Sequence, residues 1–354
     1  MRIAITADPY IPVPPRHYGG IERVVDFVVR GLVEKGHEVT LFAQSESRTA
    51  GRLVPYGTPP HSGWRARATE LLELGSELLK RRKQFDAVFS WGRMAALLPI
   101  LPDRTLPKVQ RYCRGIVPWR SVRTAVRLAG RSIRFAGASA SVYDQLPLQG
   151  RYGGHWTTLY DGTELKNFTP VLQVPSDAPL VFLGRLERIK GPHTAIQIAQ
   201  LAGRRLVLAG NIPPGEGAAF FEQEIKPHID GDHIRYIGPV DDAQKNTLLG
   251  SAAALLFPIQ WREAFGIVMA ESFACGTPVI GFPYGSVPEV IRDGINGYVC
   301  RDVNEAVEAV TRLGSIDRAG VRADCEARFG DAVVTDAVER VLIQAVADVE
   351  GRTC

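Results

Sequence analysis

The clearest pattern in the chain is an alternation between short apolar runs and longer segments that carry one apolar stripe. Residues 2–7 (RIAITA) form the first run, and a stripe of valines with one leucine follows between Val24 and Val33. Runs that are apolar on every side are typical of strands in a parallel sheet, and stripes with a helical period are typical of amphipathic helices. With Gly19 and Gly20 between them, residues 1–43 follow the strand, glycine loop, helix, strand order of half a Rossmann domain.

The same alternation extends to residue 350 and predicts an α/β protein. Residues 45–63 are expected to form a loop, and Pro170, Pro175 and Pro179 mark a linker. We therefore predict two Rossmann-like, doubly wound parallel-sheet domains, at residues 1–165 and 166–330. The further strands are expected at residues 85–90, 106–112, 155–160, 180–183, 204–210, 233–237, 253–257 and 277–281, and clear helices at 64–83, 241–250 and 331–349.

The composition is that of an ordinary globular protein, with 45% hydrophobic and 23% charged residues. No apolar run approaches the length of a membrane span, and Asp8 ends the first strand too early for a signal peptide. The five cysteines are scattered without a Cys-x-x-Cys pair. This favours reduced thiols in a cytoplasmic protein and argues against a disulfide framework or a zinc site.

The charge is divided unevenly between the two halves. Residues 1–165 contain 24 lysines and arginines against 14 acidic residues, whereas the remainder contains 18 against 24. A basic first half favours an anionic partner or a membrane surface for that domain. A nucleic-acid partner is not expected, because the chain has no basic and aromatic motif of the common binding modules.

Five arginines between residues 120 and 134 sharpen this expectation. On a helix they would fall within a wedge of about 80°, opposite an apolar side. Such a face could contact the inner membrane surface peripherally. A solvated charged face explains the same pattern, and the chain has 34 arginines against 8 lysines, so arginine here also follows the composition. The five residues are Arg120, Arg123, Arg127, Arg131 and Arg134.

The stretch EAFGIVMAE, residues 263–271, carries the most specific chemistry. A helix that starts near Phe265 would place free backbone N–H groups and the positive end of its dipole there, where a phosphate can bind. Gly266 lets a ligand approach the backbone closely. Glu263 and Glu271 can each accept two hydroxyl hydrogen bonds, as ribose and sugar diols offer. Apolar strands on either side suit a parallel sheet, whose ligands gather at the carboxyl ends of strands.

This stretch resembles the signature of the retaining glycosyltransferases of family four. The match extends to CGTPVIGFPYGSVPEVI at residues 275–291, NGYV at 296–299, GRLERIKG at 184–191 and the early Gly19-Gly20. The resemblance covers nearly the whole chain. It implies the GT-B fold, in which two Rossmann-like domains face each other across a cleft and a C-terminal helix, here residues 331–350, returns to the first domain.

The resemblance also assigns roles to the site residues. Arg185 and Lys190 are expected to bind the donor diphosphate, and cations are in any case needed to neutralise the departing charge. Glu263 is expected to hold the donor sugar and Glu271 the ribose. Together they imply retaining, metal-independent transfer from a nucleoside-diphosphate sugar, with a UDP-sugar favoured, to an unidentified acceptor. The remaining expected donor contacts are Gly20, Val240, Phe265, Gly266 and Ile267.

No metal or cofactor is expected beside the donor, which is a substrate. Asp230-Gly231-Asp232 matches the Asp-x-Asp string of metal-dependent transferases, but it should lie at the wrong sheet edge and is interpreted as a turn. Residues 110–115 lack the histidine that most relatives carry, and His17 is the nearest substitute. Two alternatives therefore stay open: a nucleotide-sugar-binding protein without transferase activity, and a GT-B epimerase of a nucleotide-linked amino sugar.

Overall fold

The computed structural model describes residues 1–16, 19–57, 63–144 and 153–351 and divides the chain into two compact units. The first unit combines Met1–Asp161 with the segment that begins at Asp331, and the second is Gly162–Gly330. Each unit is built on its own parallel sheet. The predicted α/β fold class, with two Rossmann-like parallel-sheet domains, is confirmed.

The first unit contains a seven-stranded sheet in the order β3-β2-β1-β4-β5-β6-β7, and all its pairings are parallel. Most residues of its central strands are buried because helices cover both faces, and most of these in β1, β2 and β4 are apolar. In register, Ile3 of β1 lies beside Val39 of β2 and Ala87 of β4. The strands are β1 (Arg2–Thr6), β2 (Glu38–Ala43), β3 (Arg52–Pro55), β4 (Ala87–Ser90), β5 (Lys108–Tyr112), β6 (Ile133–Gly137) and β7 (His155–Thr158).

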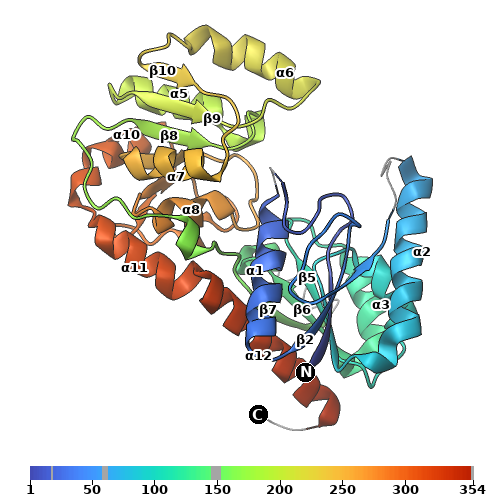
Figure 1. Ribbon diagram of the computed structural model, residues 1–354. Coiled ribbons are helices and arrows are strands. Elements are labelled where there is room, and N and C mark those ends of the chain that lie inside the picture. The colour runs from blue at the N-terminus through green and yellow to red at the C-terminus, as the bar shows by residue number, and fades with distance from the viewer. Residues whose placement is uncertain (17–18, 58–62, 145–152, 352–354) are drawn as a thin grey trace. The chain divides into compact units, whose positions relative to one another are not determined.

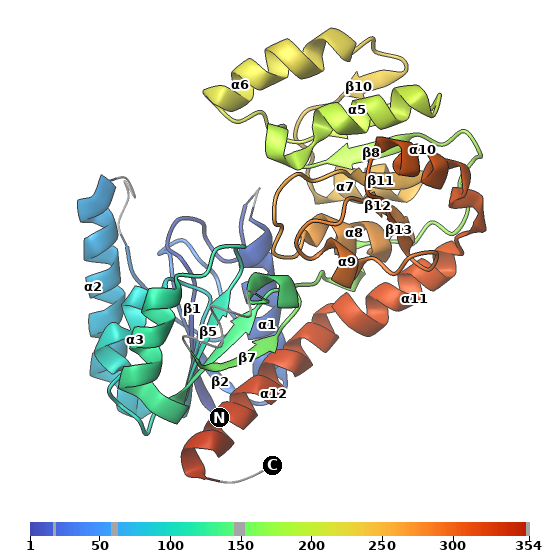
Figure 2. The same cartoon turned by 180° about the vertical axis from the view of Figure 1, so that it is seen from behind.

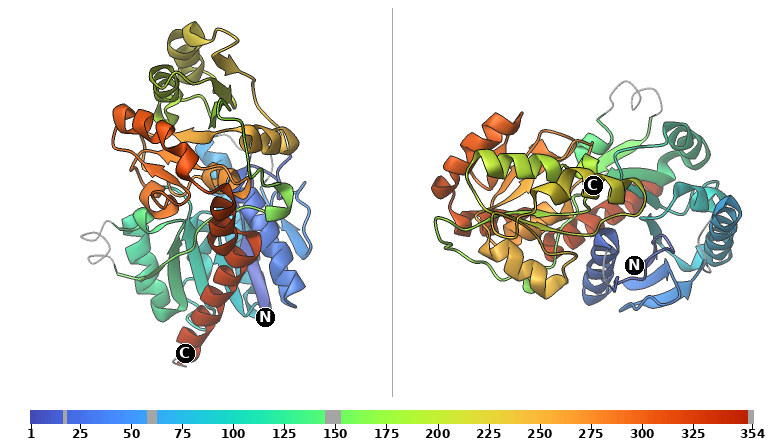
Figure 3. Two further views of the ribbon diagram at one scale, coloured as in Figure 1. Left: turned by 90° about the vertical axis from the view of Figure 1, so that its left-hand side faces the viewer. Right: turned by 90° about the horizontal axis from the view of Figure 1, so that it is seen from above.

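Among the described residues, helices cover both faces of this sheet, as Figures 1 and 3 show. Helices α1 (Gly20–Glu34) and α12 (Asp331–Glu350) pack against each other on one face. Helix α2 (Gly63–Arg81) and α3 (Trp119–Ala129) lie on the other, both against the 3-10 segment η2 (Met94–Ile100). An ion pair from Lys35 and a hydrogen bond from His37, both to Glu339, fasten α12, so the C-terminal helix belongs to the first unit.

The second unit contains a six-stranded parallel sheet in the order β10-β9-β8-β11-β12-β13 (Figure 2). On one face α5 (Pro192–Leu201) packs against α10 (Val303–Thr311). On the other, α8 (Ile267–Ala274) packs against α7 (Asp242–Ser251) and α11 (Arg318–Phe329). The other elements are β8 (Leu180–Leu183), β9 (Leu206–Ala209), α6 (Glu216–Phe220), β10 (Ile234–Tyr236), β11 (Ala254–Phe257), β12 (Val279–Gly281), α9 (Val287–Val290) and β13 (Gly297–Val299).

In both sheets the strand order reverses at one point. The strand order reverses between β1 and β4 in the first unit and between β8 and β11 in the second. At such a switch point the loops after the two strands diverge to opposite faces, and ligands of open α/β sheets bind in the crevice between them. The structure thus singles out the loops after β8 and β11, which contain the predicted residues Arg185, Lys190 and Glu263.

Two expectations about the first unit are wrong. Residues 45–63 are not all loop, because Arg52–Pro55 form β3 and α2 begins at Gly63. The four residues of β3 pair only with β2 at the sheet edge, so they carry little of the apolar pattern that marks central strands.

The arginine face is also shorter than expected. Helix α3 ends at Ala129, where Gly130 adopts a positive φ of 59°. Arg131 lies in the following 3-10 turn, and Arg134 lies in β6, where its Nε donates to Asp348 at 2.5 Å. The helical projection failed because an apolar strand directly follows the helix and prolongs the apparent stripe. The exposed arginines that α3 itself carries are Arg120, Arg123 and Arg127.

Among the described residues, no helix is both long enough and apolar enough to cross a membrane.

Lys108, at the start of β5, is an unusual member of the first core. Its side chain is fully buried, and its Nζ donates to the carbonyls of Asp103 and Leu106, both at 2.6 Å, and to Ser132 Oγ at 2.9 Å. Burial lowers the pKa of Lys108 from 10.5 to about 8. Folding therefore favours loss of its proton at alkaline pH.

We expect Lys108 to make the free energy of unfolding rise between about pH 8 and 10.5, because the unfolded chain binds one more proton in that window. The contribution is about 3 kcal/mol for a shift of this size. Denaturant unfolding of the wild type and of Lys108→Met, each at several pH values, isolates it from other titrating groups. Parallel pH profiles for the two proteins would show that the lysine does not titrate this way.

Candidate functional site

The candidate site lies at the switch point of the second sheet. The loop after β8, residues 184–191, carries Arg185 and Lys190, and the latter ends a 3-10 turn, η6 (Arg188–Lys190). The loop after β11, residues 258–266, carries Glu263. The structure therefore brings the predicted cations and the first predicted carboxylate to adjacent strand ends.

Main-chain contacts fasten these two loops to each other. The N–H of Gln260 donates to the carbonyl of Ile189 at 2.9 Å. Gly191 has a φ of 77°, and a Cβ on it would stand 2.1 Å from the carbonyl oxygen of Pro258. Only glycine permits both the conformation and the approach. Lys190 and Glu263 consequently start from backbone positions that are fixed relative to each other.

The charged groups of the two loops form ion pairs. Lys190 Nζ donates to Glu263 Oε2, and the side chains are only 20% and 16% exposed. Arg185 Nη1 lies 2.7 Å from Glu187 Oε1, with the arginine side chain 42% exposed. Arg185 Nε is buried and has no hydrogen-bond partner among the described residues. A diphosphate would therefore meet cations that already carry carboxylate partners.

Helix α8 begins four residues after Glu263. Gly266 is its N-cap, with a φ of 82° and no side-chain cap, and Ile267 is its first residue. Phe265 is buried and its ring meets that of Phe329 edge-on at 5.4 Å. The first turn of a helix directs N–H groups away from the helix and favours a negative group there. The backbone at Phe265, Gly266 and Ile267 thus has the geometry expected of a phosphate-binding turn.

Residues 284–286, in the loop after β12, hold the Glu263 loop in place. The N–H of Ser286 donates to the carbonyl of Glu263 at 2.9 Å, and Ser286 Oγ donates to that of Phe265 at 2.8 Å. Gly285 has a φ of 64°, and a Cβ on it would stand 2.2 Å from the carbonyl oxygen of Glu263. The GSVPE part of the sequence signature is therefore a support for the main chain around Glu263.

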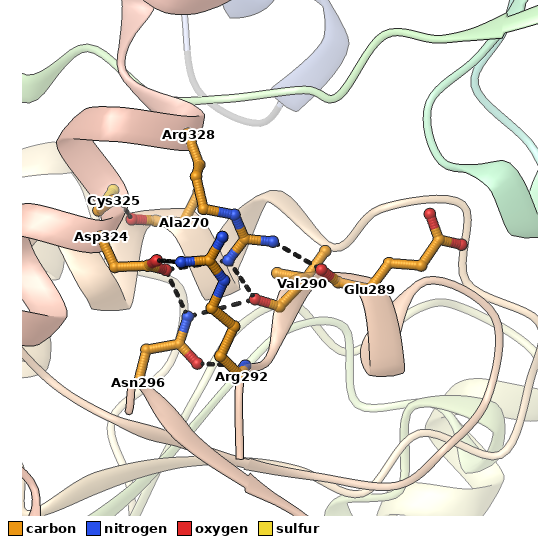
Figure 4. Close-up of polar contacts among 8 residues, drawn as sticks. All are labelled: Ala270, Glu289, Val290, Arg292, Asn296, Asp324, Cys325 and Arg328. Carbon is orange, nitrogen blue, oxygen red and sulfur yellow. Dashed lines mark hydrogen bonds and ion pairs between the residues drawn. The ribbon is translucent and has the colours of Figure 1, made fainter. Parts of the chain in front are cut away.

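Helix α11 stabilises this support from behind (Figure 4). Asp324 accepts from Asn296 Nδ2 at 2.8 Å and pairs with Arg292 and Arg328 at 2.7 and 2.9 Å. Arg328 also donates to the carbonyls of Glu289 and Val290 in α9. The network joins α11 to α9 and to the turn before β13, so the Asn-Gly of the NGYV motif has a structural role.

The second predicted carboxylate, Glu271, lies one turn into α8 and is buried. Its Oε1 accepts from Lys245 Nζ of α7 at 2.6 Å, and the two side chains are 8% and 15% exposed. Sequence reasoning missed Lys245. Its partner is 26 positions away on another helix, so no local motif could have identified it.

Helix α7 also places the predicted base contact. Val240 follows β10 and directly precedes Asp241, the N-cap of α7. Asp230-Gly231-Asp232 lies before β10, at the opposite end of this strand, and forms a turn in which Asp230 Oδ1 accepts from the N–H groups of Asp232 and Ile234, both at 2.9 Å. These hydrogen bonds lower the pKa of Asp230. The string therefore caps a turn, as its sequence position indicated.

The switch point of the first unit carries different groups. Gly20 begins α1, and Asp8 and Glu22 lie in the loop after β1 and the first turn of that helix. Burial raises the pKa of both carboxyls, against the opposing charge of Arg114. Arg93, after β4, stacks on Tyr10 with its Cζ 5.0 Å from the ring centroid. His17, the proposed substitute histidine, lies outside the described residues.

Comparison with known proteins finds two matching family models. The family model described as glycosyl transferases group 1 matches residues 167–324, and that of glycosyltransferase family 4 matches residues 18–112. The chain is 27% identical over 212 residues to D-inositol 3-phosphate glycosyltransferase of Mycolicibacterium smegmatis, a match that covers 55% of this chain and 48% of that protein. The chain thus spans about half the length of that relative.

Solved structures share the fold over nearly the whole chain. Sucrose-phosphate synthase of Thermosynechococcus elongatus superposes with a TM-score of 0.77 at 20% identity, covering 98% of this chain and 99% of that one. Anabaena Alr3699/HepE in complex with UDP-glucose gives 0.71 at 18% identity, covering 97% and 100%. The two parallel-sheet units therefore have the architecture of GT-B glycosyltransferases.

We expect Gly285→Ala to damage the site more than the fold, because its methyl group would displace the main chain at Glu263. Gly294→Ala is the matched control, since Gly294 also has a positive φ, 73°, but nothing lies within 4 Å of its Cβ position. Both variants pay a conformational cost of about 1 kcal/mol or more. Calorimetric titration with UDP should show weaker binding for Gly285→Ala alone, and equal affinities would contradict the role of the support.

Proposed function

Because the chain belongs to family four of the glycosyltransferases, we propose that it transfers a sugar from a nucleoside-diphosphate donor to an acceptor hydroxyl with retention of anomeric configuration. The observation that carries the proposal is the Lys190–Glu263 pair beside the start of α8, at the switch point of the second sheet. Phosphate-binding and hydroxyl-accepting groups meet there. A UDP-sugar is favoured, since a structure with the same fold is described with UDP-glucose.

Each site residue has a role in this proposal. Arg185 and Lys190, with the N–H groups at Phe265, Gly266 and Ile267, hold the diphosphate and neutralise the charge that grows as the glycosidic bond to phosphate breaks. These cations take the place of a metal ion. Glu263 accepts hydrogen bonds from the donor sugar and Glu271 from the ribose, and the backbone around Val240 contacts the base. The donor contact expected of Gly20, in the glycine loop before α1, stays a prediction.

Retention is proposed to proceed by front-face substitution. The departing diphosphate oxygen takes the proton of the attacking acceptor hydroxyl on the same face of the sugar, so no protein base is required at that atom. This is compatible with the absence of a histidine from residues 110–115. The protein then acts by positioning and by electrostatic stabilisation of the leaving group.

The acceptor is proposed to be anionic or presented at an anionic surface. The first half of the chain is basic, and Arg120, Arg123 and Arg127 are exposed together on α3. One relative is named for a phosphorylated acceptor, D-inositol 3-phosphate. A lipid surface offers the same phosphate chemistry, so peripheral membrane contact is the second form of this proposal.

Donor chemistry tests the proposed function directly. With UDP-glucose as donor and excess chelator present, we expect UDP release, and proton NMR should detect the α anomer of freshly released glucose first. Arg185→Ala or Lys190→Ala removes a charge-assisted contact worth about 1.5–3 kcal/mol. Release should then fall roughly 10- to 150-fold.

The two glutamates are tested separately by binding. Glu263→Gln should lower the affinity for UDP-glucose and leave the affinity for UDP unchanged, whereas Glu271→Gln should lower the affinity for both ligands.

The outcomes separate the remaining alternatives. Tight UDP-glucose binding without any UDP release or transfer would favour a binding protein. Conversion of a nucleotide-linked amino sugar without an acceptor would favour an epimerase. A loss of activity in chelator that added metal reverses would overturn metal independence. If Glu263→Gln and Glu271→Gln change the affinity for UDP equally, the roles of the two glutamates are wrongly divided.

The arginines of α3 are tested with vesicles. Each cation near an anionic surface contributes about 1 kcal/mol, so replacing Arg120, Arg123 and Arg127 with glutamine should weaken vesicle binding by roughly two orders of magnitude at moderate salt. Sedimentation with anionic and with neutral vesicles measures this. The control is replacement of Arg134, whose side chain is hydrogen-bonded to Asp348, and it is expected to change vesicle binding little. Negligible binding to both vesicle types would end the membrane proposal and leave a soluble phosphorylated acceptor.

A further inference from the structure

Lys245 is a charged residue of the second unit that the proposed chemistry does not yet use. Its Nζ lies 2.6 Å from Glu271 Oε1, and the two side chains are 15% and 8% exposed. Among the described residues, no other ion pair to Glu271 is found. The pair joins the first turns of α7 to the middle of α8 and is largely shielded from water.

The backbone of Lys245 is held firmly. Asp241 and Gln244 form a reciprocal capping box at the start of α7, and the N–H of Lys245 donates to the carbonyl of Asp241 at 2.8 Å. At the other end of α7, Thr277 Oγ1 donates to the carbonyl of Leu249 at 2.7 Å. The helix packs against α8, so Lys245 reaches Glu271 from a fixed base.

We propose that Lys245 is a positioning residue for recognition of the donor ribose, an inference that rests on the proposed function. Lys245 occupies one oxygen of Glu271 and leaves the other, Oε2, to accept from the ribose hydroxyls. It also gives the buried carboxylate a cationic partner, and a buried charge without a partner is costly. An ionised carboxylate only accepts hydrogen bonds, which is what a diol requires.

Lys245 differs in this respect from Lys190. Lys190 lies in the loop after β8, beside the start of α8, and in the proposed reaction its partner changes from Glu263 to phosphate. Lys245 lies on α7 and has Asp242 as a second acidic neighbour, with Nζ 3.6 Å from Asp242 Oδ1. It keeps Glu271 as its partner with or without donor. Lys190 therefore binds phosphate, whereas Lys245 orients the carboxylate of Glu271.

A comparison of two nucleotides tests this role. Calorimetric titration measures the affinities of the full-length chain for UDP and for 2′,3′-dideoxy-UDP, which lacks the hydroxyls that Glu271 would bind. We expect Lys245→Met to lower the affinity for UDP roughly 10- to 100-fold, the range for a lost charge-assisted contact. Its affinity for dideoxy-UDP should stay unchanged. Lys245→Arg should restore most of the UDP affinity. Asp242→Asn, which removes the distant carboxylate, is the matched control and should leave both affinities unchanged.

Equal loss of affinity for both nucleotides in Lys245→Met would overturn the proposal and make the pair a structural tie between helices. Unchanged affinity for UDP would overturn it as well. If the methionine variant does not fold, Lys245→Gln is judged by the same comparison. Failure of the wild type to bind UDP, ADP or GDP would instead overturn the proposed function, so the two failures are distinguishable.

Discussion

Two contacts between main-chain atoms hold the candidate site in shape, and its polar geometry depends on them. At Gly191 and at Gly285 the backbone approaches Pro258 and Glu263 so closely that a Cβ would stand 2.1 and 2.2 Å from a carbonyl oxygen. Long charged side chains on a surface fix little by themselves, since such pairs contribute about 1 kcal/mol or less. Because the backbone contacts fix the loops after β8 and β11, Lys190 and Glu263 can meet in one defined geometry. Preorganisation of this kind is what catalysis by positioning requires.

The cations of the site are all paired with carboxylates. Arg185, Lys190 and Lys245 each have a carboxylate partner, Glu187, Glu263 and Glu271 respectively. A cation that is already paired costs less to hold in a partly buried place than an unpaired one. In the proposed reaction a nucleoside-diphosphate sugar can replace the Lys190–Glu263 contact without leaving either group alone. Its phosphate compensates the lysine while its sugar hydroxyls compensate the carboxylate. Bare phosphate could compensate only the lysine, so the pair favours ligands that carry both groups.

The sequence predicted those features whose cause is local. Apolar runs such as residues 180–183 and 253–257 mark central strands because both faces are covered, and EAFGIVMAE marks a helix start because its glycine and carboxylates lie within one stretch. Strand β3 was not predicted, because an edge strand needs little apolar content. Arg134 was misplaced because the helical projection ran past Gly130 into a strand. Lys245 could not be found at all, since what makes it relevant is the packing of α7 on α8. Residues that act through tertiary contacts leave no trace in local spacing.

The two switch points share a topology but not a chemistry, and this limits what the fold alone implies. Beside β8 and β11 the charges are paired and a helix start faces the strand ends, which suits a phosphate with hydroxyls around it. Beside β1 and β4, burial raises the pKa of Asp8 and Glu22, while Arg93 is engaged with Tyr10. Carboxyl groups accept hydrogen bonds from hydroxyl groups and, when ionised, repel a phosphate, so this switch point suits a hydroxyl group better than a second phosphate. The strand order therefore places the ligands, and the side chains at each point decide which ligand is accepted.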